Sequence, residues 1–322
     1  MILPHYVNTF GQAMLRRYGE RVHKIAIDAD FTCPNRDGSI GRGGCTFCNN
    51  VSFSPSGRNP PTVGEQIAAG RRIIRKRTGA RKYLAYFQAY TNTYADINRL
   101  RELYDQALSE PDVIGLSVGT RPDCVPDPVL DLLAGYHRQG HEIWLELGLQ
   151  SAFDESLERV NRGHGIAEYK TAVLNARSRG LQVCTHLIIG LPGESRQHYE
   201  MTLERVLELG VDGLKLHPLH VVKGTQLANE WRRGEYRPLA LDEYVDTAAH
   251  LIRSTPPEVI FHRVTGTASR NILLAPDWCS KKWLVLNSIT NALHRQHLES
   301  SQLPRIAANC QELLNGTRMP GG

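Results

Sequence analysis

Three cysteines near the N-terminus are the residues whose type and spacing most clearly indicate chemistry. Eleven residues separate Cys33 from Cys45, and two separate Cys45 from Cys48. Thiolates this close together repel one another, so in a reducing compartment such a group usually binds metal. A zinc site would need a fourth ligand, for which His23 is the candidate. Three thiolates without a fourth ligand instead favour a [4Fe–4S] cluster, in which one iron stays open to bind a small molecule.

An alternation of strand-like and helical segments must position these cysteines. Apolar runs of strand length lie at 23–29, 82–88, 113–118, 142–150, 182–190 and 211–219. Segments with helical periodicity lie between them, at 62–78, 96–109, 127–139, 167–179 and 197–209. The alternation predicts βαβ units and a parallel sheet. Six units are too few for a closed eight-stranded barrel, so the pattern is compatible with an open six-stranded barrel or a flat doubly wound sheet.

The composition limits the class of protein. Of the 322 residues, 41% are hydrophobic and 22% are charged, which is ordinary for a globular protein. No apolar run has the length of a membrane span or of a signal peptide, and seven cysteines, an odd number, do not suggest paired disulfides. We therefore expect a cytoplasmic protein with no membrane contact. The net charge of +5 permits a polyanionic partner without requiring one.

The same segments suggest how the chain is divided. We expect an N-terminal segment at 1–22, a barrel at 23–240 and a C-terminal extension at 241–322. Within the extension, the sequence predicts one helix at 240–254 and a short strand-like run at 258–263.

Four further segments give the chain a specific resemblance. They lie at 119–133 (GTRPDCVPDPVLDLL), 146–164, 185–194 (THLIIGLPGE) and 211–227. With the cysteine loop, they resemble the YhcC/YtqA family of radical S-adenosylmethionine (SAM) proteins. The middle of the chain also resembles the radical SAM domain of the Elongator catalytic subunit, a tRNA wobble-uridine modifier. The resemblance implies an α/β fold, an open, six-stranded partial β/α barrel of the TIM type. It also implies a [4Fe–4S] cluster whose open iron binds SAM.

The resemblance further implies which residues contact SAM. Phe47 matches an aromatic residue that packs near the adenine, and Gln88 and Thr91 lie in the segment that binds the amino group. Gln150 resembles a glutamine that contacts the ribose. Arg162 matches the arginine that pairs with the SAM carboxylate, a task that suits a planar guanidinium.

Alternation along the strands predicts further polar residues inside the barrel. Side chains two apart on a strand share a face, so Glu146 and Gln150 point together, as do Lys215 and His217. His186 lies on the equivalent face of its own strand, where it is a further candidate for cofactor binding. Buried faces rarely carry such residues, so they either line a wet cavity or form buried ion pairs. Glu146, Lys215 and His217 are therefore candidate catalytic residues.

Three other features allow more than one interpretation. Gly190 lies in a glycine-rich turn that, by the resemblance, approaches the adenine. Cys279, between Trp278 and Trp283, is either a substrate-facing catalytic thiol or a packing residue. Seven cations within the twelve residues 71–82 form either a solvated helix face or a surface that docks RNA.

We therefore expect a radical SAM enzyme. In such enzymes the reduced cluster cleaves SAM to methionine and a 5′-deoxyadenosyl radical, which abstracts hydrogen from the substrate. By resemblance, the substrate is a tRNA wobble uridine side chain, and a reducing protein such as flavodoxin or ferredoxin supplies the electron. Two alternatives remain open: a radical SAM reaction on a small metabolite or porphyrin-like molecule, and a non-catalytic, metal-stabilised RNA-binding module.

Overall fold

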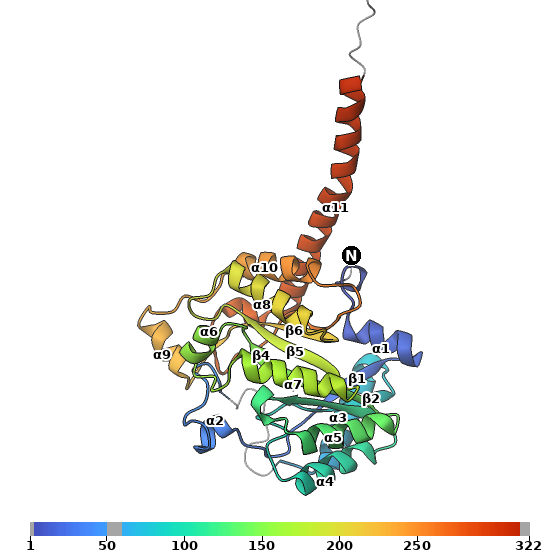
Figure 1. Cartoon of the computed structure of the whole chain (residues 1–322), viewed down its shortest axis with the longest axis vertical. Helices are drawn as coiled ribbons and strands as arrows, with labels where there is room; N and C mark the ends of the chain where they lie inside the picture. Colours follow the sequence, from blue (N-terminus) through green and yellow to red (C-terminus); the bar gives the residue numbers. More distant parts are fainter. Residues whose placement is uncertain (1–2, 50–59, 316–322) are drawn as a thin grey trace, which may run out of the picture.

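A curled, seven-stranded parallel sheet is the centre of the fold (Figure 1). The computed structural model describes residues 3–49 and 60–315, with side chains as far as residue 298. The strands are β1 (Val22–Ile27), β2 (Lys82–Phe87), β3 (Val113–Thr120), β4 (Glu142–Gln150), β5 (Gln182–Ile189), β6 (Gly213–Pro218) and β8 (Ile260–Arg263). They lie side by side in chain order, and within the described residues no ladder joins β1 to β8. The expected open, partial barrel is therefore confirmed.

Helices cover the outer face of this sheet, as the alternation predicted. They are α3 (Val63–Thr78), α4 (Ile97–Leu108), α5 (Asp127–Arg138), α7 (Ile166–Ser178), α8 (Arg196–Glu208) and α10 (Leu241–Arg253). The local sequence explains where they begin and end. Thr62 and Glu65 form a reciprocal capping box at the start of α3. Gly140, Gly180 and Gly210 follow α5, α7 and α8 with positive φ, a conformation that costs glycine little.

The seventh strand is the main difference from the expected architecture, which had six. β8 lies in the C-terminal region and pairs in parallel with β6, with Gly213 opposite Ile260. Phe261 also bridges to Thr9, just before α1 (Phe10–Tyr18). Residues from both chain ends therefore extend the sheet beyond β6. A strand of four residues gives too short a pattern to be placed in a sheet from sequence alone.

The remaining elements are short, except for the last helix. They are η1 (Leu3–His5), α2 (Pro34–Asp37), η3 (Pro122–Cys124), α6 (Asp154–Arg159), β7 (Val221–Val222), α9 (Gln226–Arg232), β9 (Leu273–Ala275), η4 (Asp277–Ser280) and α11 (Lys282–Asn315). β7 and β9 pair antiparallel. Early in α11, Val285 and Ile289 pack into the core, whereas its later turns project from the body of the protein (Figure 1). Among the described residues, no helix is both long and apolar enough to span a membrane.

Candidate functional site

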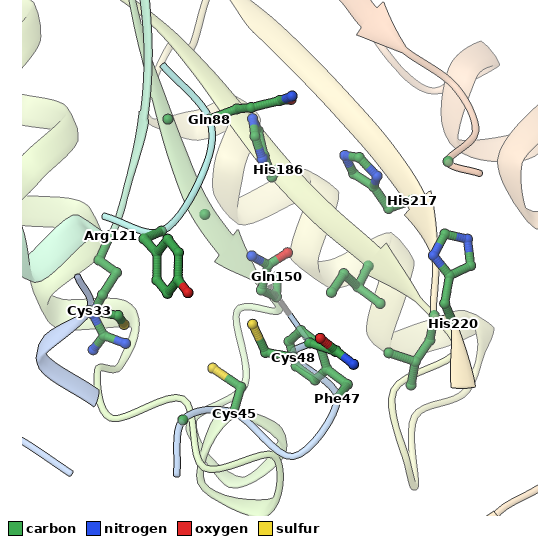
Figure 2. A pocket seen from close by; sticks show the side chains of 18 of the residues that line it. Cys33, Cys45, Phe47, Cys48, Gln88, Arg121, Gln150, His186, His217 and His220 are labelled. Carbon is green, nitrogen blue, oxygen red and sulfur yellow. The ribbon is translucent and has the colours of Figure 1, made fainter. Parts of the chain in front are cut away.

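A cavity of about 240 Å³ opens where the carboxyl ends of the strands meet (Figure 2). This is where a parallel β/α barrel gathers its reacting groups. Cys33, Cys45 and Cys48 all line it, and all three are free thiols. The structure therefore brings together the three cysteines that the spacing singled out.

Backbone contacts fix the shape of the cysteine loop. Cys33 precedes α2, and its carbonyl accepts hydrogen bonds from the next turn, the nearest from the Arg36 amide at 2.8 Å. The Cys48 amide donates to the Cys45 carbonyl at 3.0 Å. Arg36 Nη2 donates to the Cys48 carbonyl at 2.6 Å. The Asn161 side chain, beyond β4, donates to the Gly44 carbonyl at 2.9 Å, which ties the loop to the barrel.

The donor set fits a cluster with three cysteine ligands better than it fits zinc. Among the described residues, no fourth cysteine lines the cavity; Cys124 and Cys184 are buried outside its lining. His23, the proposed fourth zinc ligand, is the second residue of β1, at the amino end of that strand. His23 does not line the cavity, so it cannot supply the fourth zinc ligand there.

Positive and hydrogen-bond-donating groups surround the thiols. Arg162 Nη1 lies 3.4 Å from Cys45 Sγ, and Asn35 Nδ2 lies 3.8 Å from the same sulfur. Burial and the neighbouring Cys45 raise the pKa of Cys48, whereas the charges of Arg36 and Arg162 oppose that rise. These cations favour the thiolate forms that metal binding requires.

Arg162 is held in place by a close backbone approach. Its Nη2 donates to the Gly148 carbonyl at 2.7 Å, and its Nε is buried with no hydrogen-bond partner. A Cβ at Gly148 would lie 2.8 Å from Nη2, so a larger residue there would displace the guanidinium from this position. Two residues further along β4, Gln150 adopts a φ of 82° at an irregularity in the β4–β5 pairing. Such strained backbone is concentrated at functional sites.

The cavity collects nearly all of the residues predicted to contact SAM. Its lining includes Phe47 from the cysteine loop, Gln88 and Thr91 after β2, Gln150 at the end of β4, Arg162, and His186 from β5. Gly190 is the exception, because it does not line the cavity. Its amide donates to Tyr199 Oη at 3.0 Å, and its carbonyl accepts from Tyr236 Oη at 2.8 Å.

Comparison with known proteins decides the family. The model of the Radical SAM superfamily matches residues 37–206, and that of the Radical_SAM C-terminal domain matches residues 211–295. Protein YhcC of Escherichia coli (strain K12) is 51% identical over 305 residues, which cover 95% of this chain and 98% of that protein. The chain is a radical SAM enzyme. Within the superfamily it belongs to the YhcC/YtqA family, and enzymes of the superfamily use a [4Fe–4S] cluster and SAM.

Two archaeal proteins with more distant similarity extend the comparison. The tRNA uridine(34) acetyltransferase of Methanocaldococcus jannaschii is 29% identical over 161 residues, which cover 48% of this chain but only 29% of that protein. The solved structure of Methanocaldococcus infernus Elp3 with an N-terminal deletion superposes with a TM-score of 0.53 at 21% identity, covering 78% of this chain and 57% of that one. The structural match supports the fold of the partial barrel.

Below the cavity, a buried cluster of charges fills the interior of this radical SAM barrel. Glu146 is fully buried, and its carboxylate accepts from Lys24 Nζ at 2.5 Å, from Lys215 Nζ and from the Ser117 hydroxyl. Although burial opposes ionisation, Lys215 and Lys24 hold the pKa of Glu146 well below its usual range. Neither Glu146 nor Lys215 lines the cavity.

His186 connects this cluster to the cavity. Its Nε2 lies 2.8 Å from Glu146 Oε2, while its ring lines the cavity (Figure 2). Burial and the nearby Lys215 lower the pKa of His186 to about 4, so the ring is neutral at pH 7. Because Glu146 is ionised and can only accept, Nε2 carries the proton and donates a hydrogen bond to Glu146. Nδ1 is then a hydrogen-bond acceptor.

Cys279 lies away from this site. It is completely buried in η4, within the hydrophobic core that also contains Trp278 and Tyr244. It does not line the cavity, so the geometry favours the packing interpretation over a substrate-facing thiol. His217, in contrast, does line the cavity.

The basic run 71–82 extends away from the cavity, toward the amino ends of the strands. Arg21, just before β1, donates to the Thr78 carbonyl at 2.7 Å, which places the end of α3 at the amino ends of the strands. Arg71 there pairs with Glu110 at 2.8 Å. A strand of six residues, such as β1, spans about 20 Å. The end of the run therefore lies about a strand length from the cavity, whereas its start, just after Gly70, lies beside Ile25 in the middle of β1. The cations at the end of α3 are thus too far away to contact a nucleotide bound in the cavity.

Two arginines that line the cavity carry no signal in the sequence. Arg121, after β3, makes a two-pronged pair with Asp123 at 2.9 and 2.8 Å, and its Nη1 donates to the Arg162 carbonyl at 2.8 Å. Arg263 is the last residue of β8. Each follows or ends a parallel strand, and only that position could have suggested a role at the site.

Proposed function

We propose that Cys33, Cys45 and Cys48 hold the [4Fe–4S] cluster and leave one iron free to bind SAM. The observation that carries this proposal is that three free cysteines share one cavity, whose described lining holds no fourth cysteine and no acid. When bound there, a reduced cluster would supply the electron that cleaves SAM to methionine and a 5′-deoxyadenosyl radical, which would abstract hydrogen from the substrate. A reducing protein such as flavodoxin or ferredoxin is the proposed electron donor.

The chain's own residues position SAM in this proposal. Arg162, beside Cys45, pairs with the SAM carboxylate, for which its unpartnered Nε gives a free donor. Phe47 packs against the adenine, and Gln150 contacts the ribose. His186 offers Nδ1 as an acceptor for a hydroxyl or amine.

The cavity also protects a reactive intermediate from water. Apolar side chains contribute to its lining, among them Ile188, Leu219 and Val222, which are all buried. Excluding water in this way prevents side reactions of a radical. The protein therefore binds and orients, and the cofactors supply the chemistry.

For the substrate, we propose a uridine of tRNA. The support is the similarity to the tRNA uridine(34) acetyltransferase of M. jannaschii, which extends over 161 residues, 48% of this chain. The net charge of +5 is compatible with a polyanionic substrate. The alternative substrate is a small metabolite or porphyrin-like molecule, and the following experiment distinguishes it from tRNA.

Nucleoside profiling tests this assignment directly. Total tRNA from a strain lacking the gene should contain a nucleoside that disappears when the tRNA is incubated anaerobically with reconstituted enzyme, SAM and a reductant. Formation of 5′-deoxyadenosine should accompany that loss. The Cys45→Ala variant is the matched control and should leave the nucleoside unchanged. Identical nucleoside profiles of tRNA from the deletion strain and from the wild type, with no tRNA-dependent 5′-deoxyadenosine, would contradict the tRNA proposal and favour a small substrate.

A further inference from the structure

The charge of the cavity lining is strongly one-sided. Its described residues include no aspartate and no glutamate, but four arginines: Arg36, Arg121, Arg162 and Arg263. The first three lie around the thiols: Arg36 bonds the Cys48 carbonyl, Arg162 lies beside Cys45, and the charge of Arg121 acts on Cys33 and Cys45. Arg263 has no such role. Among the described residues, no carboxylate pairs with it and no hydrogen bond engages it.

Arg263 lies instead beside a group of histidines. It ends β8 next to β6, with Lys215 as its register partner, and its charge acts on His186, His217 and His220. His217 is near the end of β6, and His220 lies in the turn that follows. Figure 2 shows His186 and His217 across the cavity from the three cysteines. Arg263 therefore belongs to a different part of the cavity from the cysteine loop.

This part of the cavity has polar atoms that nothing in the described chain satisfies. Nε2 of His217 and Nε2 of His220 are both buried without a hydrogen-bond partner. The loop after β8 closes over the two rings, since a Cβ at Gly266 would lie 3.0 Å from His217 Nδ1 and 3.3 Å from His220 Cε1. Thr267, next in that loop, also lines the cavity. Buried polar atoms without partners are costly, so a bound group that satisfies them would bind favourably.

The protonation of these groups fits an anion. Burial and the charge of Arg263 lower the pKa of His217 well below its usual range, and burial lowers that of His220 to about 4. Both rings are therefore neutral at pH 7, so each carries a single N–H; His217 can present its N–H to a bound anion, whereas the Gly266 backbone competes for that of His220. Arg263 is a permanent cation with a planar set of donors, which suits carboxylate and phosphate oxygens.

We propose that Arg263, His217 and His220 form a subsite that binds an anionic group of the substrate, a carboxylate or a phosphate. This inference rests on the proposed function, because it assigns the SAM carboxylate to Arg162 beside the cysteines. The SAM molecule then has no second anion for Arg263 to bind. The subsite positions the substrate on the side of the cavity opposite the cluster, which leaves the space between them for the reacting atoms.

Titration with simple anions tests this subsite. Reconstituted enzyme with SAM bound is titrated calorimetrically with inorganic phosphate and, separately, with acetate, at constant pH and ionic strength. We expect saturable binding of at least one anion. Arg263→Gln should weaken it by about tenfold or more, the effect of losing a charge-assisted hydrogen bond. Arg263→Lys should restore part of the affinity, because a point charge lacks the planar geometry. Tighter phosphate binding would indicate a phosphate group, and tighter acetate binding a carboxylate.

Two controls separate this subsite from general electrostatics and from unfolding. Arg270→Gln removes the same charge from the loop that follows β8; Arg270 is exposed, as Arg263 is, but does not line the cavity, so anion affinity should not change. The iron content of Arg263→Gln should equal that of the wild type, which shows that the fold is intact. Absence of saturable binding, or equal affinity in Arg263→Gln and the wild type, would overturn the subsite. Anion binding without SAM binding would instead uphold the subsite and overturn the proposed function.

Discussion

The interior of the barrel and the cavity above it are built from the same kinds of residues but differ in how those residues are paired. In the interior, Glu146 accepts from two lysines, and His186 donates to it. In the cavity, three atoms are buried without partners: Nε of Arg162, Nε2 of His217 and Nε2 of His220. In the interior, Nε2 of His262 also lacks a partner, although its Nδ1 lies 2.9 Å from Lys24 Nζ. A buried charge whose partners are complete stabilises one arrangement of the strands. Unsatisfied groups at the carboxyl ends of strands instead indicate where a ligand binds.

This comparison explains why residue type alone did not separate structure from function. Glu146, Lys215 and His217 were all catalytic candidates because alternation put them on inward faces. Only His217 lines the cavity, whereas the two charged residues neutralise each other beneath it. The depth of a residue along its strand decides which role it has.

The largest expected effect comes from breaking the interior cluster. Glu146→Ala would leave Lys24 and Lys215 buried without their carboxylate, so the free energy of unfolding should fall by about 3–5 kcal/mol. Denaturant titration measures this loss. Glu102→Ala is the matched control, because its pair with Arg99 is exposed and should contribute roughly 0.5 kcal/mol or less. Equal effects of the two changes would show that the interior charges are dispensable.

A change on the cavity side should act on ligand binding instead. Arg162→Ala should weaken SAM binding by about 1.5–3 kcal/mol, the range for a hydrogen bond to a charged group. Arg162→Lys should restore only part of this affinity, and both variants should keep their iron. Calorimetry with SAM gives the affinities. Arg159→Ala, nearby on α6 but exposed, should bind SAM as the wild type does. Unchanged affinity in Arg162→Ala would contradict the proposed carboxylate contact.

His186, which belongs to both regions, should make stability depend on pH. In the folded protein it faces Glu146, Lys215 and Arg263, and its pKa is lowered to about 4. Unfolded histidine titrates near pH 6.5, so the unfolded chain binds the proton first, and stability falls as pH drops from about 6.5 toward 4. His186→Gln should make this dependence shallower by up to about 1.4 kcal/mol per pH unit.

Melting curves between pH 7 and pH 5 measure that dependence. His137→Gln, on the exposed side of α5, is the control and should retain the slope of the wild type. A slope in His186→Gln as steep as in the wild type would mean that the other histidines dominate.

The smallest effect is expected from the basic run. Reversing Arg72, Arg75 and Lys76 to glutamate should change tRNA affinity only slightly at physiological salt, because screening acts beyond about 8 Å and these residues lie on the part of α3 that runs away from the cavity. Electrophoretic mobility shifts with the wild type and the triple variant measure this. Complete loss of tRNA binding would mean that RNA extends along the outside of the barrel to its far end.

Much of the fold could be predicted because its signals are local. The apolar run at 142–150 predicted both ends of β4, and spacing alone singled out the three cysteines. Arg121 and Arg263 could not be found this way, because a single arginine near a strand end has no characteristic spacing. The contacts of Gly190 come from Tyr199 and Tyr236, and the second of these is distant in the chain. The position of the basic run, however, follows from topology, since a helix between parallel strands returns to their amino ends.

Iron content across single cysteine variants tests the central claim most directly. Each of the seven cysteines is changed to alanine, and iron per chain is measured after anaerobic reconstitution. We predict about four irons in the wild type and loss of the cluster in Cys33→Ala, Cys45→Ala and Cys48→Ala. Variants of Cys124, Cys184 and Cys279 should keep it, as should the variant of Cys310, whose side chain lies outside the described residues. Normal iron in Cys33→Ala together with loss of iron in Cys279→Ala would contradict the assignment.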